Sequence, residues 1–201
     1  MASRLSRRQF VAAGAAALSA RPLLGQAPTV LVPSAFRPLV VASANGNHFT
    51  NGGPRTAIVE AFERIVRGEQ VLDALVAGVN IVELDPEDTS VGYGGLPNSD
   101  GVVQLDASCI DGSKRRAGAV GALEGVRTPS LVARAVMNET DHHLVVGEGA
   151  QRLARQLGFK VEDDLNTPKS RALWLEWKRR TDPVHFPDPA ARESAAARAR
   201  D

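Results

Sequence analysis

The sequence has little cysteine, few aromatic residues and no long apolar run. Its one cysteine, Cys109, excludes an internal disulfide and any zinc site built from several cysteines. No apolar run reaches the roughly 18 residues that a membrane-spanning helix needs. The 24 Lys and Arg against 23 Asp and Glu leave a net charge of +1, so no overall field attracts nucleic acid or an anionic membrane. We therefore expect no metal, cofactor, nucleic-acid or membrane partner, and a small-molecule ligand.

Residues 1–36 are typical of an export signal and a linker. The paired arginines Arg7 and Arg8 precede a short apolar segment, Val11 to Leu18, that is rich in alanine and glycine. This order of charge, apolar run and small residues is typical of a twin-arginine signal. A basic N-terminus whose arginines are adjacent by chance is the alternative. We expect export by the twin-arginine route to the periplasm or to the medium.

Hydrophobic periodicity predicts one α/β domain over residues 37–180. Spacings of three and four residues predict helices, alternation predicts strands, and glycine or proline marks their ends. The expected strands are 38–43, 103–109, 117–123 and 142–146, and the expected helical stripes are 58–66, 71–79, 129–136, 150–157 and 168–177. Residues 181–201 hold three prolines and an alanine-arginine run, which predicts a flexible C-terminal tail. Because a stable sheet usually has more strands than these, we expect half of a layered structure.

The segment Ser90–Asn98 holds the densest glycine cluster of the sequence. It lacks the Gly-Lys-Ser/Thr ending of a nucleotide-binding loop and follows a helix, which makes phosphate binding the less favoured interpretation. A tight turn whose backbone passes close to a neighbouring element is the favoured one.

Seven short segments, taken in order, resemble the N-terminal half of the glycosylasparaginases. The resemblance runs from about Pro38 to about Trp177. The segments are Gly78–Glu83, Ser90–Pro97, Leu105–Ala107, Asp111–Gly112, Arg116–Leu123, Pro129–Arg134 and Thr140–Ala150.

This resemblance implies the αββα four-layer sandwich of the N-terminal-nucleophile hydrolases, of which this chain is the N-terminal half. In that family a precursor cuts itself once, and the new N-terminal threonine of the β chain attacks the side-chain amide of an asparagine that carries N-acetylglucosamine. The resemblance therefore implies no catalytic residue in this chain, which would be inactive alone. It also implies a β-chain partner and a dimer of heterodimers. The family cuts after an aspartate, which makes Asp201 the expected autocleavage residue.

The family's α chain contributes a tryptophan from the loop after its first strand. Here that loop, Ser43–His48, has no tryptophan, which affects the expected recognition of the glycan more than the amide chemistry. Asn45 is the expected substrate-binding substitute, because its amide can bind a polar substrate edge.

Two other functions stay open. One is an isoaspartyl peptidase or L-asparaginase of the same superfamily, and the other is a non-catalytic remnant that has lost its second half. If this chain did carry its own nucleophile, the hydroxyl candidates would be Ser90, Ser108 and Thr140, none of which has a base positioned by the sequence.

Other chemistry-bearing side chains have simpler structural interpretations. Adjacent residues on a strand point to opposite faces, so His142 and His143 do not suit a shared metal. Trp174 and Trp177 lie three apart on one helix, which is more typical of a packing edge than of a sugar platform. Turn and strand positions explain the acidic residues Asp100, Asp106 and Asp111 without an acid-base role.

Overall fold

The computed structural model describes residues 37–186, 188–190 and 193. The chain divides into two units, and the second, residues 38–201, holds all the described helices and strands. The predicted export signal and the predicted autocleavage residue Asp201 lie outside the described residues. No helix in the described part of the chain is long and apolar enough to cross a membrane.

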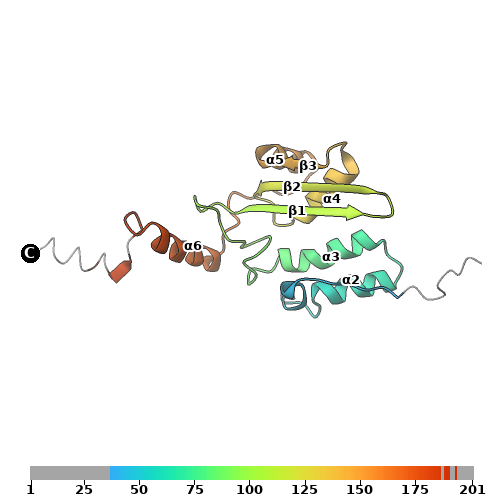
Figure 1. The fold of residues 1–201 in the computed structure, drawn as a ribbon, viewed down its shortest axis with the longest axis horizontal. Coiled ribbons are helices and arrows are strands. Elements are labelled where there is room, and N and C mark those ends of the chain that lie inside the picture. Colours follow the sequence, from blue (N-terminus) through green and yellow to red (C-terminus); the bar gives the residue numbers. More distant parts are fainter. Residues whose placement is uncertain (1–36, 187, 191–192, 194–201) are drawn as a thin grey trace, which may run out of the picture. The chain divides into compact units, whose positions relative to one another are not determined.

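The second unit is a mixed α/β structure with one small sheet (Figure 1). A 3-10 helix, η1, covers Ala44–Asn47. The helices are α2 (Ala57–Val66), α3 (Val71–Glu83), α4 (Pro129–Glu139), α5 (Gly147–Gln156) and α6 (Pro168–Thr181), and the strands are β1 (Gln104–Asp111), β2 (Arg116–Glu124) and β3 (Leu144–Val146). These bounds confirm the five predicted helices and three of the four predicted strands.

The prediction of a first strand at residues 38–43 is wrong. No strand forms there, and Leu39 and Val41 are 83% and 81% exposed. A β-prone run needs a neighbouring strand for its backbone hydrogen bonds, and no described strand pairs with this one.

The three strands form one sheet in the order β1-β2-β3, in which β1 and β2 are an antiparallel hairpin and β3 is parallel to β2. The hairpin register shifts between Leu105 and Ala107. At this irregularity the Asp106 carboxylate accepts a hydrogen bond from the backbone N–H of Ala122 at 2.7 Å. At the hairpin turn Asp111 accepts hydrogen bonds from Ser113, which lower the pKa of its carboxyl. Both aspartates therefore have the structural roles that the sequence favours.

One face of the sheet is covered by helices. Helix α4 crosses the strands on this face, and α3 and α5 complete the core. The fully buried side chains of this core include Leu123, Val132, Val136 and Met137. Gly118 lies so close to α4 that a Cβ atom there would be 2.3 Å from the backbone oxygen of Ala133. The small residues of β2 thus allow α4 to pack closely against the strand.

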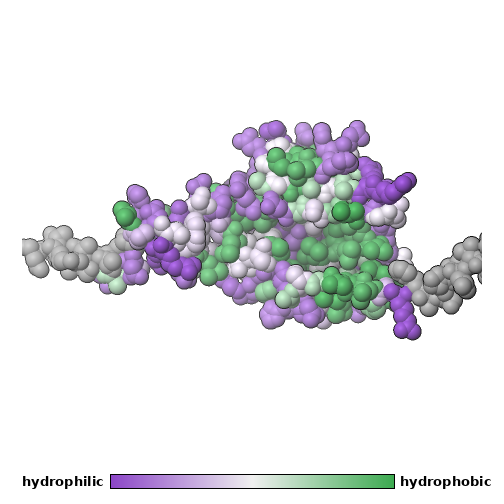
Figure 2. Space-filling view, in the orientation of Figure 1, coloured by the Kyte–Doolittle hydropathy of each residue, from purple (hydrophilic) through white to green (hydrophobic). Residues whose placement is uncertain are grey.

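The other face of the sheet is open within the described chain. On this face β2 presents small residues, and the neighbouring strands present Ile110, Leu144 and Val146, which are 75%, 57% and 56% exposed. Figure 2 shows apolar side chains gathered over the hairpin and over α2 and α3. A monomeric soluble protein rarely exposes so continuous an apolar surface, so this open face is typical of an interface.

We expect Gly118→Ala to destabilise the protein by about 3 kcal/mol, because the added methyl group meets backbone rather than a movable side chain. Gly112→Ala is the matched control, since no atom lies within 4 Å of the place that its methyl group would occupy. The control variant should stay within about 0.5 kcal/mol of the parent. Urea unfolding of the three proteins measures both changes, and equal midpoints for the two variants would contradict the close packing of β2 on α4.

Candidate functional site

The glycine segment after α3 is a close-packed turn. Gly92 has a positive φ of 59°, and a Cβ atom there would lie 2.1 Å from the backbone oxygen of Glu83. The next residue, Tyr93, donates its backbone N–H to that same oxygen at 2.7 Å. Gly94 donates its backbone N–H to the oxygen of Leu165 at 2.9 Å. The close-turn interpretation of this segment is therefore confirmed.

A buried carboxylate holds the start of this segment against α4. Glu83, at the end of α3, is 2% exposed. Its oxygens accept hydrogen bonds from the backbone N–H and the hydroxyl of Ser130 at 3.0 and 2.8 Å, and from the amide of Asn80 at 2.6 Å. Burial raises the pKa of Glu83, while the hydrogen bonds from Ser130 and Asn80 oppose that shift. The carboxylate thus caps the N-terminus of α4, where a negative group is favoured.

An ion pair fixes the other side of the segment. The guanidinium of Arg127 makes two hydrogen bonds of 2.8 Å to Glu162 and lies 3.7 Å from the centre of the Tyr93 ring. The hydrogen bond from Arg127 lowers the pKa of Glu162. Bidentate pairing and ring contact give this arginine a single geometry. The glycine segment is thus held at both sides.

A polar cluster lies where this segment begins. The hydroxyl of Ser90 lies 2.8 Å from both carboxylate oxygens of Asp88, and it accepts a hydrogen bond from the amide nitrogen of Asn45 at 3.1 Å. The amide oxygen of Asn45 accepts from the Ser43 hydroxyl and, at 2.9 Å, from the backbone N–H of Gly46. We call these three side chains the Asn45–Ser90–Asp88 cluster. The structure thus brings together the predicted substrate-binding residue and one predicted hydroxyl.

The cluster can bind a polar ligand edge. Asp88 is 4% exposed, Asn45 is half-buried and Ser90 is exposed. A serine hydroxyl has one proton and two lone pairs. Because the proton is directed to Asp88 and one lone pair faces Asn45, the other lone pair is left to accept an N–H or O–H from a ligand. The second amide proton of Asn45 is left to donate.

The other predicted hydroxyls lie elsewhere. Ser108 lies on β1, and Thr140 follows α4 and donates its hydroxyl to the backbone oxygen of Val136 at 2.7 Å. Among the described residues, neither hydroxyl makes a hydrogen bond to a member of the Asn45–Ser90–Asp88 cluster.

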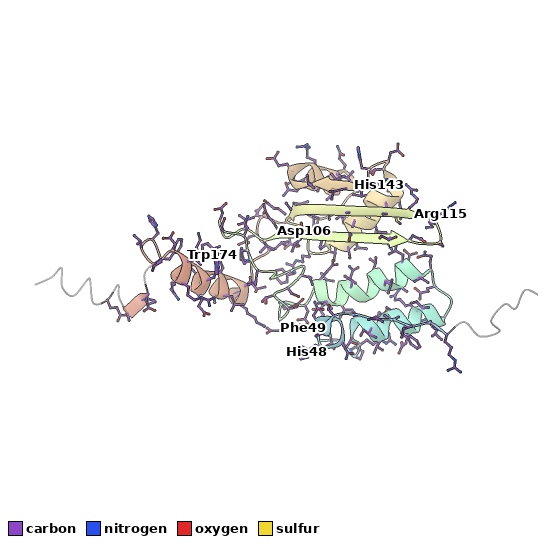
Figure 3. All side chains as sticks on the ribbon, in the orientation of Figure 1. His48, Phe49, Asp106, Arg115, His143 and Trp174 are labelled. Atoms are coloured by element: carbon purple, nitrogen blue, oxygen red, sulfur yellow. The ribbon has the colours of Figure 1, made fainter. Side chains whose placement is uncertain are left out.

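His48 and His143 do not lie in one cluster. Figure 3 shows His143 at the opposite side of the unit from His48. Among the described residues, no group of three or more His, Cys, Asp or Glu side chains is placed to hold a metal ion.

Two features of this region were not predicted from the sequence. One is Asp88, whose carboxylate orients Ser90. The spacing of two residues between an aspartate and a serine, typical of a side-chain turn, is the signal that points to it. The other is the aromatic pair His48 and Phe49, at the end of the loop Ser43–His48 that lacks the family's tryptophan. Their rings meet edge-on with centres 4.8 Å apart (Figure 3).

Comparison with known proteins identifies the family. The model of the family described as asparaginase matches residues 42–199. The N(4)-(beta-N-acetylglucosaminyl)-L-asparaginase of Elizabethkingia miricola is 42% identical over 141 residues, 70% of this chain and 39% of the relative. The enzyme of that name from Mus musculus is 35% identical over 159 residues, 76% and 46% of the two chains. The plant-type L-asparaginase of Pyrococcus abyssi is 38% identical over 128 residues, 64% and 41% of the two chains.

These matches span less than half the length of each of the three relatives. The asparaginase model nevertheless covers most of this chain, including the Asn45–Ser90–Asp88 cluster and all the described helices and strands. The resemblance to glycosylasparaginases is confirmed, and the chain belongs to the asparaginase family, whose fold is that of the N-terminal-nucleophile hydrolases.

Proposed function

We propose that this chain is the α portion of an amidohydrolase that cleaves the side-chain amide of glycosylated asparagine. The observation that carries the proposal is its similarity, at 42% and 35% identity, to two relatives named for glycosylated asparagine. In the proposed enzyme a second part supplies the nucleophile, an N-terminal threonine whose free amine acts as its own base. The length of the relatives supports such a second part.

The structure supports a division of labour between the two parts. In the Asn45–Ser90–Asp88 cluster, Ser90 is hydrogen-bonded to a carboxylate and an amide, and neither is the imidazole or amine that usually activates a hydroxyl nucleophile. The cluster suits binding instead. We propose that the Ser90 hydroxyl oxygen accepts a hydrogen bond from an N–H or O–H group that takes part in the reaction. We also propose that Asn45 orients the polar edge of the substrate.

The open face of the sheet supports the proposed four-layer architecture. A second sheet packs about 10 Å from the first in a sandwich. The row of small residues on β2, Ala117, Ala119 and Gly121, permits that approach, and the exposed Ile110 and Leu144 supply the apolar contact. We propose that the β part covers this face and that two such heterodimers associate. We also propose export by the twin-arginine route, from the Arg7-Arg8 pattern.

A second candidate function is hydrolysis of plain asparagine or of β-aspartyl dipeptides. The similarity to a plant-type L-asparaginase, at 38% identity, favours it. The absence of a tryptophan from the loop Ser43–His48 also favours it, because that loop then offers a smaller aromatic surface to a sugar.

Turnover by the full-length protein encoded by the gene decides between these candidates. The substrates are N-acetylglucosaminyl-asparagine, asparagine and a β-aspartyl dipeptide at equal concentrations. We expect the highest kcat/KM for the glycosylated substrate. A higher kcat/KM for either of the other two would replace the first proposal by the second, and no turnover of any of them would support a non-catalytic remnant.

Ser90→Ala should lower kcat/KM of the full-length protein by about tenfold to a hundredfold, the range expected for one hydrogen bond to a charged group. The free energy of unfolding should fall by no more than about 1–3 kcal/mol, because the buried Asp88 loses the hydroxyl donor but keeps the backbone N–H of Ser90 at 3.1 Å. Ser113→Ala is the matched control, since Ser113 is also exposed and donates its hydroxyl to a buried aspartate two residues before it, Asp111, at 2.6 Å. Unchanged kcat/KM for Ser90→Ala would remove the cluster from the active site.

A further inference from the structure

The loop before α2 holds the two Asn-Gly pairs of the sequence, Asn45–Gly46 and Asn51–Gly52. They lie on either side of His48 and Phe49, which Figure 3 labels. An asparagine followed by glycine is chemically reactive, because the backbone nitrogen of the next residue can attack the side-chain amide carbon and glycine has no side chain to obstruct that attack. Since the two pairs have the same sequence, the structure decides whether each one reacts.

The pair Asn51–Gly52 forms the tip of an exposed turn. The two residues have φ angles of 49° and 72°, and Gly53 donates its backbone N–H to the Thr50 oxygen at 2.8 Å, as in a type I′ turn. The backbone N–H of Asn51 donates to Asp85 at 2.7 Å and holds the start of the turn. Among the described residues, neither the Gly52 N–H nor the Asn51 side-chain amide makes a hydrogen bond. Both reacting groups are therefore exposed to solvent and unconstrained.

The pair Asn45–Gly46 is held in place. Gly46 is buried, and its N–H donates to the backbone oxygen of Ser43 at 3.1 Å and to the side-chain oxygen of Asn45 at 2.9 Å. The amide nitrogen of Asn45 donates to the Ser90 hydroxyl at 3.1 Å. The attacking nitrogen and the leaving nitrogen are thus both hydrogen-bonded. Reaction at this pair requires the loop to open locally first.

We propose that Asn51 is a site of spontaneous deamidation and that the folded loop protects Asn45 from the same reaction. This proposal does not rest on the proposed function, because it depends only on groups within the loop. It explains how the candidate substrate-binding residue keeps its amide beside a second, reactive pair of the same sequence.

The reaction at Asn51 needs water as its only co-reactant. The Gly52 nitrogen loses its proton and bonds to the side-chain amide carbon of Asn51, and the bond from that carbon to the amide nitrogen breaks. The amide nitrogen leaves as ammonia with the proton, and a five-membered succinimide ring remains. Water then adds to either carbonyl carbon of the ring and opens it to aspartate or isoaspartate. The net change replaces an amino group by a hydroxyl group and adds one negative charge at neutral pH.

Peptide mapping of the full-length protein tests the proposal. The folded protein is kept in mildly alkaline buffer made with heavy-oxygen water, and samples are digested at intervals and analysed by mass spectrometry, in which fragment ions assign each event to Asn45 or Asn51. We expect one heavy oxygen atom in each deamidated product. The rate at Asn51 should exceed the rate at Asn45 by at least about tenfold, the ratio for a loop opening that costs about 1.4 kcal/mol.

The same protein unfolded in urea is the control. There the two pairs should react at similar rates, because the protection of Asn45 belongs to the folded loop. Deamidation of Asn51 no faster than that of Asn45 in the folded protein would overturn the proposal. So would a folded protein in which neither residue reacts while both react in urea, because the turn at Asn51 would then be protected as well.

Discussion

The arrangement of the chain around its candidate site depends on the burial of one carboxylate, Glu83. A buried carboxylate without donors is strongly unfavourable, so the groups that satisfy it must stay together. Those groups are the N-terminus of α4 at Ser130 and the amide of Asn80 on α3. The backbone oxygen of the same residue receives the N–H of Tyr93. One residue thus sets the positions of two helices and of the glycine segment that follows the Asn45–Ser90–Asp88 cluster.

A second constraint is the unequal covering of the sheet. Helix α4 packs so closely on one face that Gly118 has no room for a side chain, while the other face presents Ile110, Leu144 and Val146. A sheet with one apolar face uncovered needs a second layer. This open face is consistent with the proposed second part of the enzyme.

Local sequence signals predicted the helices and the two strands of the hairpin, because hydrophobic spacing and glycine or proline ends depend on residues close together in the sequence. The strand expected at 38–43 did not form, since a strand depends on a partner that its own residues cannot specify. Trp174 and Trp177 appeared equivalent at a spacing of three, but Asn98, Gly101 and Phe186 contact Trp174 and bury it. The burial of Glu83 also depends on tertiary structure, because glutamate at a helix end is usually exposed. Asn45 is a prediction from its loop alone, whereas its contact with Ser90 joins residues 45 positions apart and depends on the tertiary structure.

The central proposal is that this chain forms one part of a two-part enzyme. The most direct test is the intact mass and the N-terminal sequence of the purified full-length protein. We predict two polypeptides that elute together, the second of which begins with threonine. An active protein that remains a single uncut polypeptide would contradict the proposal.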